Sequence, residues 1–472
     1  MADESLSLLT VGELSEKIRK KAVSPVELTD AVLSRIERLN PKLNAFTTVT
    51  EDLARDAARA AEKEVTGGRY RGPFHGIPVG IKDLTDTAGV RTTYGSDSWR
   101  DYVPQVDAEI VRRLKEGGAV MVGKTATHEV GFGATTNNPF FGPTRNPWNP
   151  DHIPGGSSGG SGAAVAADMV IAANGSDGGG SIRIPSCFCG IPGVKPTLGL
   201  ISRFGLLGPG TSTFGVEGPM CKTVTDCALM LGVLAGVDPR DPYTRPVPLA
   251  DYVAELGRGV RGLRLGVSPD LCPTAVDPDV QAGYERAVRV LQEAGVEVRE
   301  VRLPNKDVVP DTLLKIFGGE FALWHRLNAR TRRIVYSPDV ARWTEPALRL
   351  TLDDYLIAQL DRERVRSDYV AAFTQVDVLL GPTQAFPAPE IGQDRVVLGG
   401  VDYDLLTAIV AYTAPCNLTG MPGVSVPVGF SRGGLPVGVQ IIAPHFEEAR
   451  ALRVAKALED GMPDVRARRP AV

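Results

Sequence analysis

The chain is poor in the residues that build disulfide scaffolds and metal centres. Its 472 residues include only six cysteines and five histidines. So few cysteines in so long a chain exclude a disulfide framework. Cys187 and Cys189 form a C-x-C pair without a second pair of metal ligands, and His128 lacks the spacing of a zinc motif. We therefore expect no metal site and predict that both cysteines are buried as small apolar side chains.

Long apolar runs and a strong charge of one sign are absent as well. No uncharged run is long enough to cross a membrane, and MADESLSLLT lacks the pattern of a signal peptide. A net charge of −4 gives no electrostatic reason to expect nucleic acid or a membrane as a partner. Hydrophobic residues make up 43% and charged residues 23% of the chain, as in ordinary globular proteins. These features predict a cytoplasmic protein with no nucleic-acid or membrane partner.

What the chain has in abundance is glycine and serine between residues 155 and 196. This stretch reads GGSSGGSGAAVAADMVIAANGSDGGGSIRIPSCFCGIPGVKP. Glycine-rich backbone can approach a substrate closely and direct several N–H groups at one point. Serines in such backbone suggest an acyl-transfer site with an oxyanion hole. Neither serine cluster contains a histidine, so the general base must come from another segment.

A candidate base lies upstream, in the segment HGIPVGIKDLTD. Residues 77–81 form a short apolar run that predicts a buried strand, and Lys82 follows directly. A lysine held at the end of a buried strand loses solvation, which lowers its pKa. Neutral Lys82 could then accept a proton from a serine, as in Ser-Lys variants of the hydrolytic triad.

Taken together, these motifs resemble the amidase signature family. The resemblance rests on GIPVGIKD, GGSSGGS and SDGGGSIRIP, and it extends to residues 122–150 and 417–444. It implies a triad in which Ser181 is the nucleophile and Lys82 is the base. Ser157, placed after a non-proline cis peptide, becomes the serine that bridges them. The resemblance further implies a serine amidohydrolase that needs no metal or organic cofactor.

The resemblance also assigns residues around the triad. Asp177 and Arg183 are expected to brace the nucleophile loop by hydrogen bonds and charge pairing. Ser158 either donates to the triad or satisfies loop backbone, and Ser161 is expected to begin a helix. Four main-chain N–H groups are expected to surround the developing oxyanion, namely those of Gly178, Gly179, Gly180 and Ser181.

Strand and helix signals alternate along the middle of the chain and predict an α/β fold. The resemblance implies a single large amidase-signature fold, in which helices surround a central mixed β-sheet and a helical region caps the pocket. We expect an N-terminal helical segment, the signature core, a variable cap region with linkers, and the C-terminal part of the core sheet, at residues 1–70, 71–235, 236–365 and 366–472.

Several elements can be predicted singly. Capping boxes that begin at Thr10 and Ser24 are expected to open two N-terminal helices. The sequence SRGG at residues 431–434 predicts a hairpin between two C-terminal strands. Further strands are predicted at 119–122, 169–173 and 263–267, and further helices at 52–65, 108–116, 280–294, 310–333 and 447–458.

Substrate selection is expected in the cap region and in the loop formed by residues 125–138. Within this loop, Thr127, His128 and Gly131 are candidate pocket residues. A loop histidine satisfied by its neighbours is the other interpretation of His128. The resemblance is compatible with a homodimer that acts on a small-molecule amide.

A competing interpretation concerns the serine cluster itself. The segment GGSSG matches the G-x-S-x-G pattern of an α/β-hydrolase nucleophile elbow. That elbow follows a buried strand, whereas residues 145–154 contain three prolines. We therefore do not expect Ser157 to be the nucleophile of such an elbow.

Two different functions compete with that of a stand-alone amidase. The glutaminase component of a tRNA-dependent amidotransferase, its A subunit, liberates ammonia from glutamine and belongs to the same family. Against it, Ile184 gives SIRIP where such subunits typically read SIRQP, and no segment resembles their YDGVRYG. The second competing function is that of a non-catalytic scaffold, and the intact serine–serine–lysine set argues against it. The sequence favours a hydrolase of linear carboxylic amides, with anilides, esters and carbamates as further candidate substrates.

Overall fold

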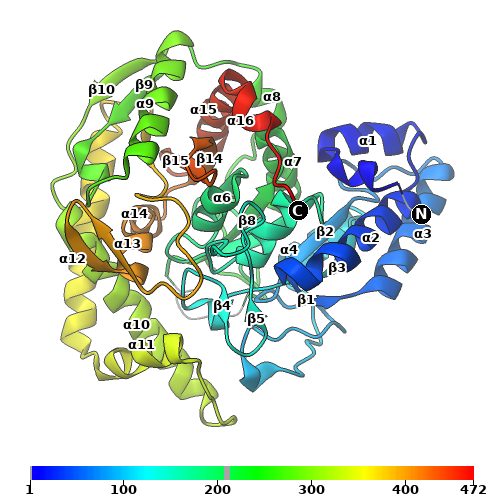
Figure 1. Ribbon diagram of the computed structural model, residues 1–472, viewed down its shortest axis with the longest axis horizontal. Coiled ribbons are helices and arrows are strands. Elements are labelled where there is room, and N and C mark those ends of the chain that lie inside the picture. Colours follow the sequence, from blue (N-terminus) through cyan, green and yellow to red (C-terminus); the bar gives the residue numbers. More distant parts are fainter. Residues whose placement is uncertain (1–2, 207–212) are drawn as a thin grey trace.

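The computed structural model describes residues 3–206 and 213–472. Within these residues, eleven strands form one sheet in the order β1-β3-β2-β6-β8-β7-β14-β15-β11-β9-β10. Helices surround the sheet, which confirms the predicted α/β class (Figure 1). The strands of this sheet are β1 (Phe46–Val49), β2 (Pro78–Lys82), β3 (Val120–Thr125), β6 (Ala172–Asp177), β7 (Gly193–Lys195), β8 (Val216–Cys221), β9 (Arg264–Val267), β10 (Glu297–Glu300), β11 (Val378–Pro382), β14 (Gly423–Phe430) and β15 (Pro436–Ile442).

The strand directions make the sheet mixed. β2 runs parallel to both of its neighbours, β3 and β6, whereas β6 runs antiparallel to β8. Because parallel strands end at the same edge of a sheet, Lys82 and Asp177, the last residues of β2 and β6, come to the same edge. Two small hairpins lie outside this sheet, β4 (Asn137–Asn138) with β5 (Gly142–Pro143) and β12 (Arg395–Leu398) with β13 (Val401–Asp404).

The N-terminal helices begin where the sequence predicts. The side chains of Thr10 and Ser24 accept main-chain N–H bonds, and Glu13 and Glu27 complete both capping boxes. The helices of the first half are α1 (Val11–Arg19), α2 (Pro25–Leu43), α3 (Glu51–Thr66), α4 (Glu109–Glu116), α5 (Gly159–Ala166), α6 (Arg183–Cys189), α7 (Val224–Leu234) and α8 (Tyr252–Leu256).

The helices of the second half include a group of three, α10 to α12, that lies across the molecule from α1–α3 (Figure 1). α10 packs against both α11 and α12. The helices of this half are α9 (Pro278–Glu293), α10 (Val309–Asn328), α11 (Pro338–Arg349), α12 (Leu352–Ala372), α13 (Leu405–Ala411), α14 (Ala414–Thr419), α15 (Glu448–Gly461) and α16 (Pro463–Ala467).

The expected cap range, 236–365, is not purely a cap. Its first half contributes β9 and β10, which are the last two strands of the main sheet. β9 pairs in parallel with β11, from the C-terminal part of the chain, so this edge of the sheet forms only after distant segments meet. The range also contains the helices α8 to α11 and most of α12. The predicted hairpin around residues 431–434 is confirmed, because β14 and β15 pair antiparallel on either side of it.

Three predicted elements are displaced. The strand expected at 169–173 is β6, which starts at Ala172 because residues before it follow the left-handed Asp168 out of α5. Ser161 does not begin a helix: α5 starts at Gly159, and the Ser161 hydroxyl donates to the carbonyl of Asn174 at 2.8 Å. The helix expected to reach residue 333 ends at Asn328, beyond which the chain is polar and exposed.

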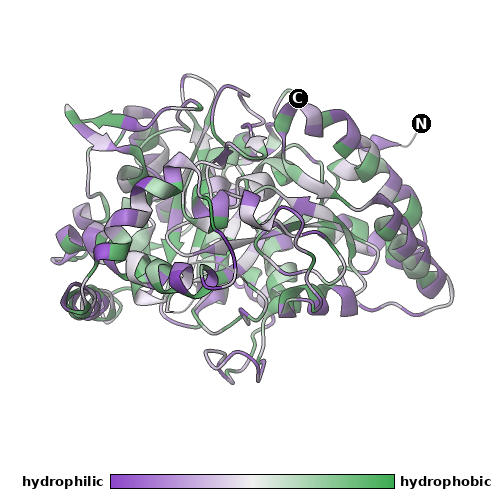
Figure 2. Ribbon diagram, turned by 90° about the horizontal axis from the view of Figure 1, so that it is seen from below, coloured by the Kyte–Doolittle hydropathy of each residue, from purple (hydrophilic) through white to green (hydrophobic). Residues whose placement is uncertain are grey.

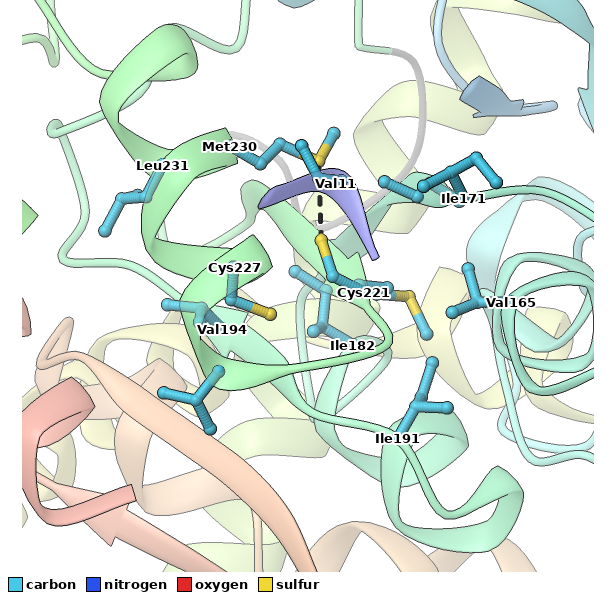
Figure 3. Close-up of a cluster of buried hydrophobic side chains, with 14 of the residues drawn as sticks. Val11, Val165, Ile171, Ile182, Ile191, Val194, Cys221, Cys227, Met230 and Leu231 are labelled. Carbon is cyan, nitrogen blue, oxygen red and sulfur yellow. Dashed lines mark hydrogen bonds between the residues drawn. The ribbon is translucent and has the colours of Figure 1, made fainter. Parts of the chain in front are cut away.

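Apolar side chains fill the space between sheet and helices. In Figure 2 the central strands are mostly green or white, and purple residues are frequent on the peripheral helices. Figure 3 shows one buried cluster, in which Val11, Ile182 and Met230 converge. There the Cys221 thiol lies 3.8 Å from the sulfur of Met230. The cysteine prediction is confirmed, since Cys187 and Cys189 are buried free thiols.

The structure also bears on membrane association. None of the helices within the described residues combines the length and the apolar character that crossing a bilayer requires.

Candidate active site

Lys82 is the centre of a buried polar cluster. It is the last residue of β2, and its side chain has no exposed surface. Its Nζ atom lies 2.7 Å from the hydroxyl oxygens of both Ser157 and Ser158 and 2.9 Å from that of Ser176. Strand β6 supplies Ser176, and the loop before α5 supplies the other two serines. The sheet thus brings together side chains that are widely separated in the sequence.

Burial determines the charge of this lysine. Removal from water lowers the pKa of Lys82 from 10.5 to about 7, although the negative charges of Asp177 and Glu217 act in the opposite direction. A substantial fraction of Lys82 is therefore the neutral amine at neutral pH. This agrees with the expectation that a lysine at the end of a buried strand becomes a usable base.

Ser157 is held by its main chain. The Gly156–Ser157 peptide is cis, as the family resemblance implies. The carbonyl of Ser157 accepts hydrogen bonds at 3.0 Å from the Thr127 hydroxyl and from the N–H of His128. Thr127 and His128 therefore fix the backbone that presents the Ser157 hydroxyl to Lys82, which is a positioning contact in addition to any contact with substrate.

Ser181 lies beside the serine pair and is partly exposed. Its carbonyl accepts the N–H of Ser158 at 3.3 Å, which places it next to the cluster. Within the part of the chain that the structure describes, the Ser181 hydroxyl forms no hydrogen bond. A catalytic hydrogen bond that is open in the free enzyme can close when substrate binds. The hydroxyl is accordingly free to meet a ligand from solvent.

The main-chain donors around Ser181 differ from expectation at one position. The N–H of Gly180 donates to Asp177 Oδ1 at 2.7 Å and is therefore not directed at a substrate. The fixed carboxylate competes for this donor, which the sequence pattern could not reveal. Among the hydrogen bonds of residues 3–206 and 213–472, none uses the N–H of Gly178, Gly179 or Ser181. These three groups remain available to stabilise an oxyanion.

Asp177 and Arg183 form the core of a fully buried network. The Arg183 guanidinium contacts the two carboxylate oxygens of Asp177 at 3.0 and 3.1 Å. Burial alone would raise the pKa of Asp177, but the charge of Arg183 holds it at about 2. Arg183 also donates to the carbonyl of Thr413 and to the side-chain oxygens of Asn417 and Gln440. The expected bracing contacts are present and tie the loop to the C-terminal part of the chain.

Gly131 and His128 border the site in different ways. A Cβ atom on Gly131 would lie 3.7 Å from the Ser157 hydroxyl, so this glycine adjoins the serine cluster directly. His128 is buried, its Nδ1 lies 3.3 Å from the Thr135 hydroxyl, and burial holds its pKa well below the usual range. Its neutral ring also lines a cavity of about 80 Å³ together with Asp339 and Arg342. His128 thus has a hydrogen-bonding neighbour in its loop, as one interpretation expects, and it also lines a cavity, as a pocket residue would.

α10, in the expected cap region, and α13, beyond it, supply an apolar wall on the side of Gly179. A Cβ atom on Gly179 would lie 3.4 Å from Leu313 of α10 and 3.9 Å from Val410 of α13. Further along α10, the ring of Phe317 lies 4.8 Å from that of Phe132. The wall next to the oxyanion donors is therefore hydrocarbon rather than charged.

Sequence reasoning missed three buried residues of the cluster, Asn174, Ser176 and Glu217. Asn174 and Ser176 occupy alternate positions of β6 and so share one face of that strand. Two polar residues at alternate positions of an otherwise small and apolar strand are a signal that could have identified this face. Glu217 carried no such signal, because a single acidic residue in a segment usually lies on the surface.

The described residues provide no obvious metal centre. No group of three or more histidine, cysteine, aspartate or glutamate side chains in residues 3–206 and 213–472 is placed to hold a metal ion.

The site combines a lysine with a pKa near 7, neighbouring serines and unpaired main-chain N–H donors. Together they define a serine-dependent hydrolase site at the edge of a mixed β-sheet. The chain belongs to the amidase signature family, because the model of the Amidase family matches residues 27–452. It is accordingly an amidohydrolase that acts on C–N amide bonds by serine-based catalysis.

Curated relatives are similar along nearly the whole chain. The A subunit of Glutamyl-tRNA(Gln) amidotransferase from Geobacter sp. (strain M21) is 39% identical over 96% of both chains. The corresponding protein from Geotalea daltonii is 40% identical, again over 96% of both chains.

Solved structures of the family superpose closely. A chain from a vestigial protein complex linked to the origins of an s-triazine catabolic enzyme has a TM-score of 0.91 and 33% identity, covering 96% of this chain and 98% of that one. A bacterial aryl acylamidase has a TM-score of 0.89 and 29% identity, covering 98% and 99%. The A subunit of Glutamyl-tRNA(Gln) amidotransferase from Thermotoga maritima has a TM-score of 0.81 and 34% identity, covering 98% and 96%.

Proposed function

We propose that this chain hydrolyses carboxylic amides through an acyl-enzyme on Ser181, with Ser157 and Lys82 as the proton relay. The single observation that carries the proposal is the 2.7 Å contact between Lys82 Nζ and the Ser157 hydroxyl in a fully buried environment. A buried amine with a pKa of about 7 can accept a proton at neutral pH, as a general base must.

Hydrogen-bond accounting at Lys82 supports the direction of the relay. A neutral amine has two N–H donors and one lone pair, so three hydroxyl contacts require at least one hydroxyl to donate to it. The Ser158 hydroxyl already donates to the carbonyl of Ser176 at 3.3 Å, so it accepts from Lys82. Ser157 and Ser176 are the two hydroxyls left to donate to the Lys82 lone pair, and the proposed relay uses that of Ser157.

The reaction then proceeds in two halves. Ser181 attacks the carbonyl carbon while its proton passes to Ser157 and that of Ser157 passes to Lys82. The N–H groups of Gly178, Gly179 and Ser181 stabilise the oxyanion, and removing such a donor elsewhere costs about 3–4 kcal/mol. The relay returns the proton to the leaving nitrogen, which departs as an amine. Water then attacks the acyl-enzyme ester, the acyl group leaves as a carboxylic acid, and Ser181 regains its proton through the same relay.

For the substrate, the geometry favours an amide with an apolar acyl group, as a stand-alone amidase would use. Leu313 and Val410 face Gly179, so the acyl portion of a bound substrate lies against hydrocarbon. Free glutamine carries an ammonium and a carboxylate next to its side chain, and this wall offers neither charge a partner.

A second candidate is the glutamine-hydrolysing component of a tRNA-dependent amidotransferase. Relatives of that name are 39–40% identical over 96% of this chain, and they support this candidate more strongly than they support the first. The cavity beside His128 contains both Asp339 and Arg342, charges of the two signs that an amino acid would need. Under this function the chain would work with partner proteins rather than alone.

A hydrolysis panel separates the candidates. The purified chain is incubated with an aliphatic amide, an anilide, a carbamate and glutamine, and ammonia or amine release is measured against Ser181→Ala. Hydrolysis of the apolar amides but not of glutamine supports the stand-alone amidase. Hydrolysis of glutamine supports the amidotransferase component. If no substrate turns over and a fluorophosphonate fails to label Ser181, the chain is a scaffold and the proposal fails.

The location, the oligomeric state and the division into parts are proposed together with the function. We propose that the chain is cytoplasmic and homodimeric and that the division at residues 70, 235 and 365 separates its functional parts. Light scattering of the purified chain tests the dimer, and a monomeric mass would contradict it.

A further inference from the structure

Glu217 is a buried acid that the proposed reaction does not use directly. It lies on β8, which neighbours β6 in the sheet, and it has no exposed surface. Its Oε1 atom accepts hydrogen bonds from the Thr85 hydroxyl at 2.6 Å and from the Asn174 amide at 3.0 Å. Its Oε2 atom is buried without any hydrogen-bond partner within the described residues. A buried carboxylate oxygen without a partner is unfavourable, so this position calls for an explanation.

One amide group connects this acid to the candidate base. The Asn174 side-chain oxygen accepts the main-chain N–H of Lys82 at 2.8 Å, while its nitrogen donates to Glu217. Both ends of the amide are thereby occupied, which fixes its orientation. The Asn174 amide thus links Glu217 on β8 to the main chain of Lys82 on β2, while the Lys82 amine itself contacts the serines.

The charges that face this unit can be named. Lys82 is influenced by Asp177 at the end of β6 and by Glu217 on β8, and it in turn acts on His128. Asp177 is already paired with Arg183, so its charge is largely compensated. Glu217 is the remaining acid that acts on Lys82, and its charge also interacts with the buried Lys124 of β3.

We propose that Glu217 is a positioning residue whose charge acts through space on the Lys82 amine and thereby sets the pH at which Lys82 becomes a free base. The inference rests on the proposed role of Lys82 as base. When Glu217 is ionised its charge stabilises the ammonium form of Lys82, and when it is protonated Lys82 gives up its proton more easily.

The energetics place both groups in the same pH range. Burial raises the pKa of Glu217 to about 7, against the lowering effects of Thr85, Lys82, Asn174 and Lys124. Burial lowers the pKa of Lys82 to about 7. Two interacting groups that titrate together lose their protons as a pair, so the activity profile reports on both.

The test is Glu217→Gln, which preserves the size of the side chain and an acceptor for Thr85 and Asn174 but can never carry the charge. We expect the acid limb of the pH profile to move to lower pH by about half to one unit, which raises the rate on the acid limb about three- to tenfold. The plateau rate should stay within about threefold. A profile that superimposes on that of the wild type would overturn the inference.

A matched control is available in the same chain. Glu448 is also fully buried, also has one oxygen without a partner, and also has a raised pKa, but it faces Lys195 rather than Lys82. Glu448→Gln should therefore leave the acid limb unmoved. If it produces the same shift as Glu217→Gln, the effect is general to buried acids and the inference fails.

Covalent labelling of Ser181 reports on its reactivity without knowledge of the substrate. The rate at which a fluorophosphonate labels Ser181 is measured against pH in the wild type, both variants and Ser181→Ala. Labelling that persists in Ser181→Ala overturns the proposed function, whereas labelling lost there with an unmoved Glu217→Gln profile overturns only the inference. If Glu217→Gln does not fold, the wild-type profile decides: a limb broader than one ionisation supports coupled titration of Glu217 and Lys82, and a single-ionisation limb contradicts it.

Discussion

The N–H of Gly180 lies 2.7 Å from Asp177 Oδ1, in the loop that leads to Ser181. The same carboxylate is paired with Arg183, so one buried acid both neutralises a buried cation and holds the loop backbone. This contact removes one of four expected oxyanion donors and leaves those of Gly178, Gly179 and Ser181. The geometry of the loop thus depends on an ion pair rather than on glycine content alone.

The first prediction concerns this ion pair. Asp177→Asn leaves the charge of Arg183 buried without a counter-ion, which should lower the free energy of unfolding by about 3–5 kcal/mol. Denaturant titration measures the change. The exposed pair of Arg395 and Asp402 provides the control, because Asp402→Asn should cost less than about 1 kcal/mol. Equal effects of the two substitutions would contradict the importance of the buried pair.

The same pair predicts a dependence of stability on pH. Asp177 has a pKa of about 2 in the folded chain and 3.8 as its ordinary value. A depressed carboxyl pKa contributes stability that is present above the unfolded value and is lost as pH falls through the folded value. The wild type should therefore lose this contribution between about pH 4 and pH 2. Asp177→Asn should show a shallower loss of unfolding free energy over that window.

A second prediction tests the nucleophile. Ser181→Ala should reduce turnover by about a thousandfold or more, because only the oxyanion donors and substrate binding remain. The unfolding free energy should change little, since the hydroxyl makes no hydrogen bond within the described chain. Full turnover in this variant would remove Ser181 from the mechanism.

The base carries a third prediction. The kcat/KM of the wild type should rise with pH through about 7, because Lys82 acts only after it has lost its proton. Lys82→Ala should lower kcat by several orders of magnitude at every pH. A flat profile between pH 6 and pH 9, or a variant with retained pH dependence, would exclude Lys82 as the titrating base.

Neighbouring glycines give a fourth prediction with an internal control. Gly180 has a φ of 130°, and a Cβ atom there would overlap the hydroxyl of Thr413. Gly180→Ala should therefore displace the loop and reduce kcat by about a hundredfold or more. Gly179→Ala places its methyl group in ordinary contact with Leu313 and should cost less than about tenfold. Steady-state kinetics of both variants provide the comparison, and similar losses would contradict the steric argument.

Local signals predicted much of the fold. The capping boxes at Thr10 and Ser24 start helices where expected, because each depends on residues within one helical turn. The hairpin around residues 431–434 depends on a short turn and was equally predictable. The pairing of β9 with β11 was not, because it joins segments whose contact no local pattern encodes.

The sequence by itself determined the family, the α/β class and the candidate positions Lys82, Ser157 and Ser181, since these follow from short motifs of fixed spacing. Only the tertiary structure decided the charge environment of the site. The lowered pKa of Lys82, the neighbouring Glu217 and the withdrawn N–H of Gly180 all arise where separate segments exclude water together. Residue identity supplies the chemical groups, whereas burial and through-space charge set their protonation, and those depend on every strand that packs around them.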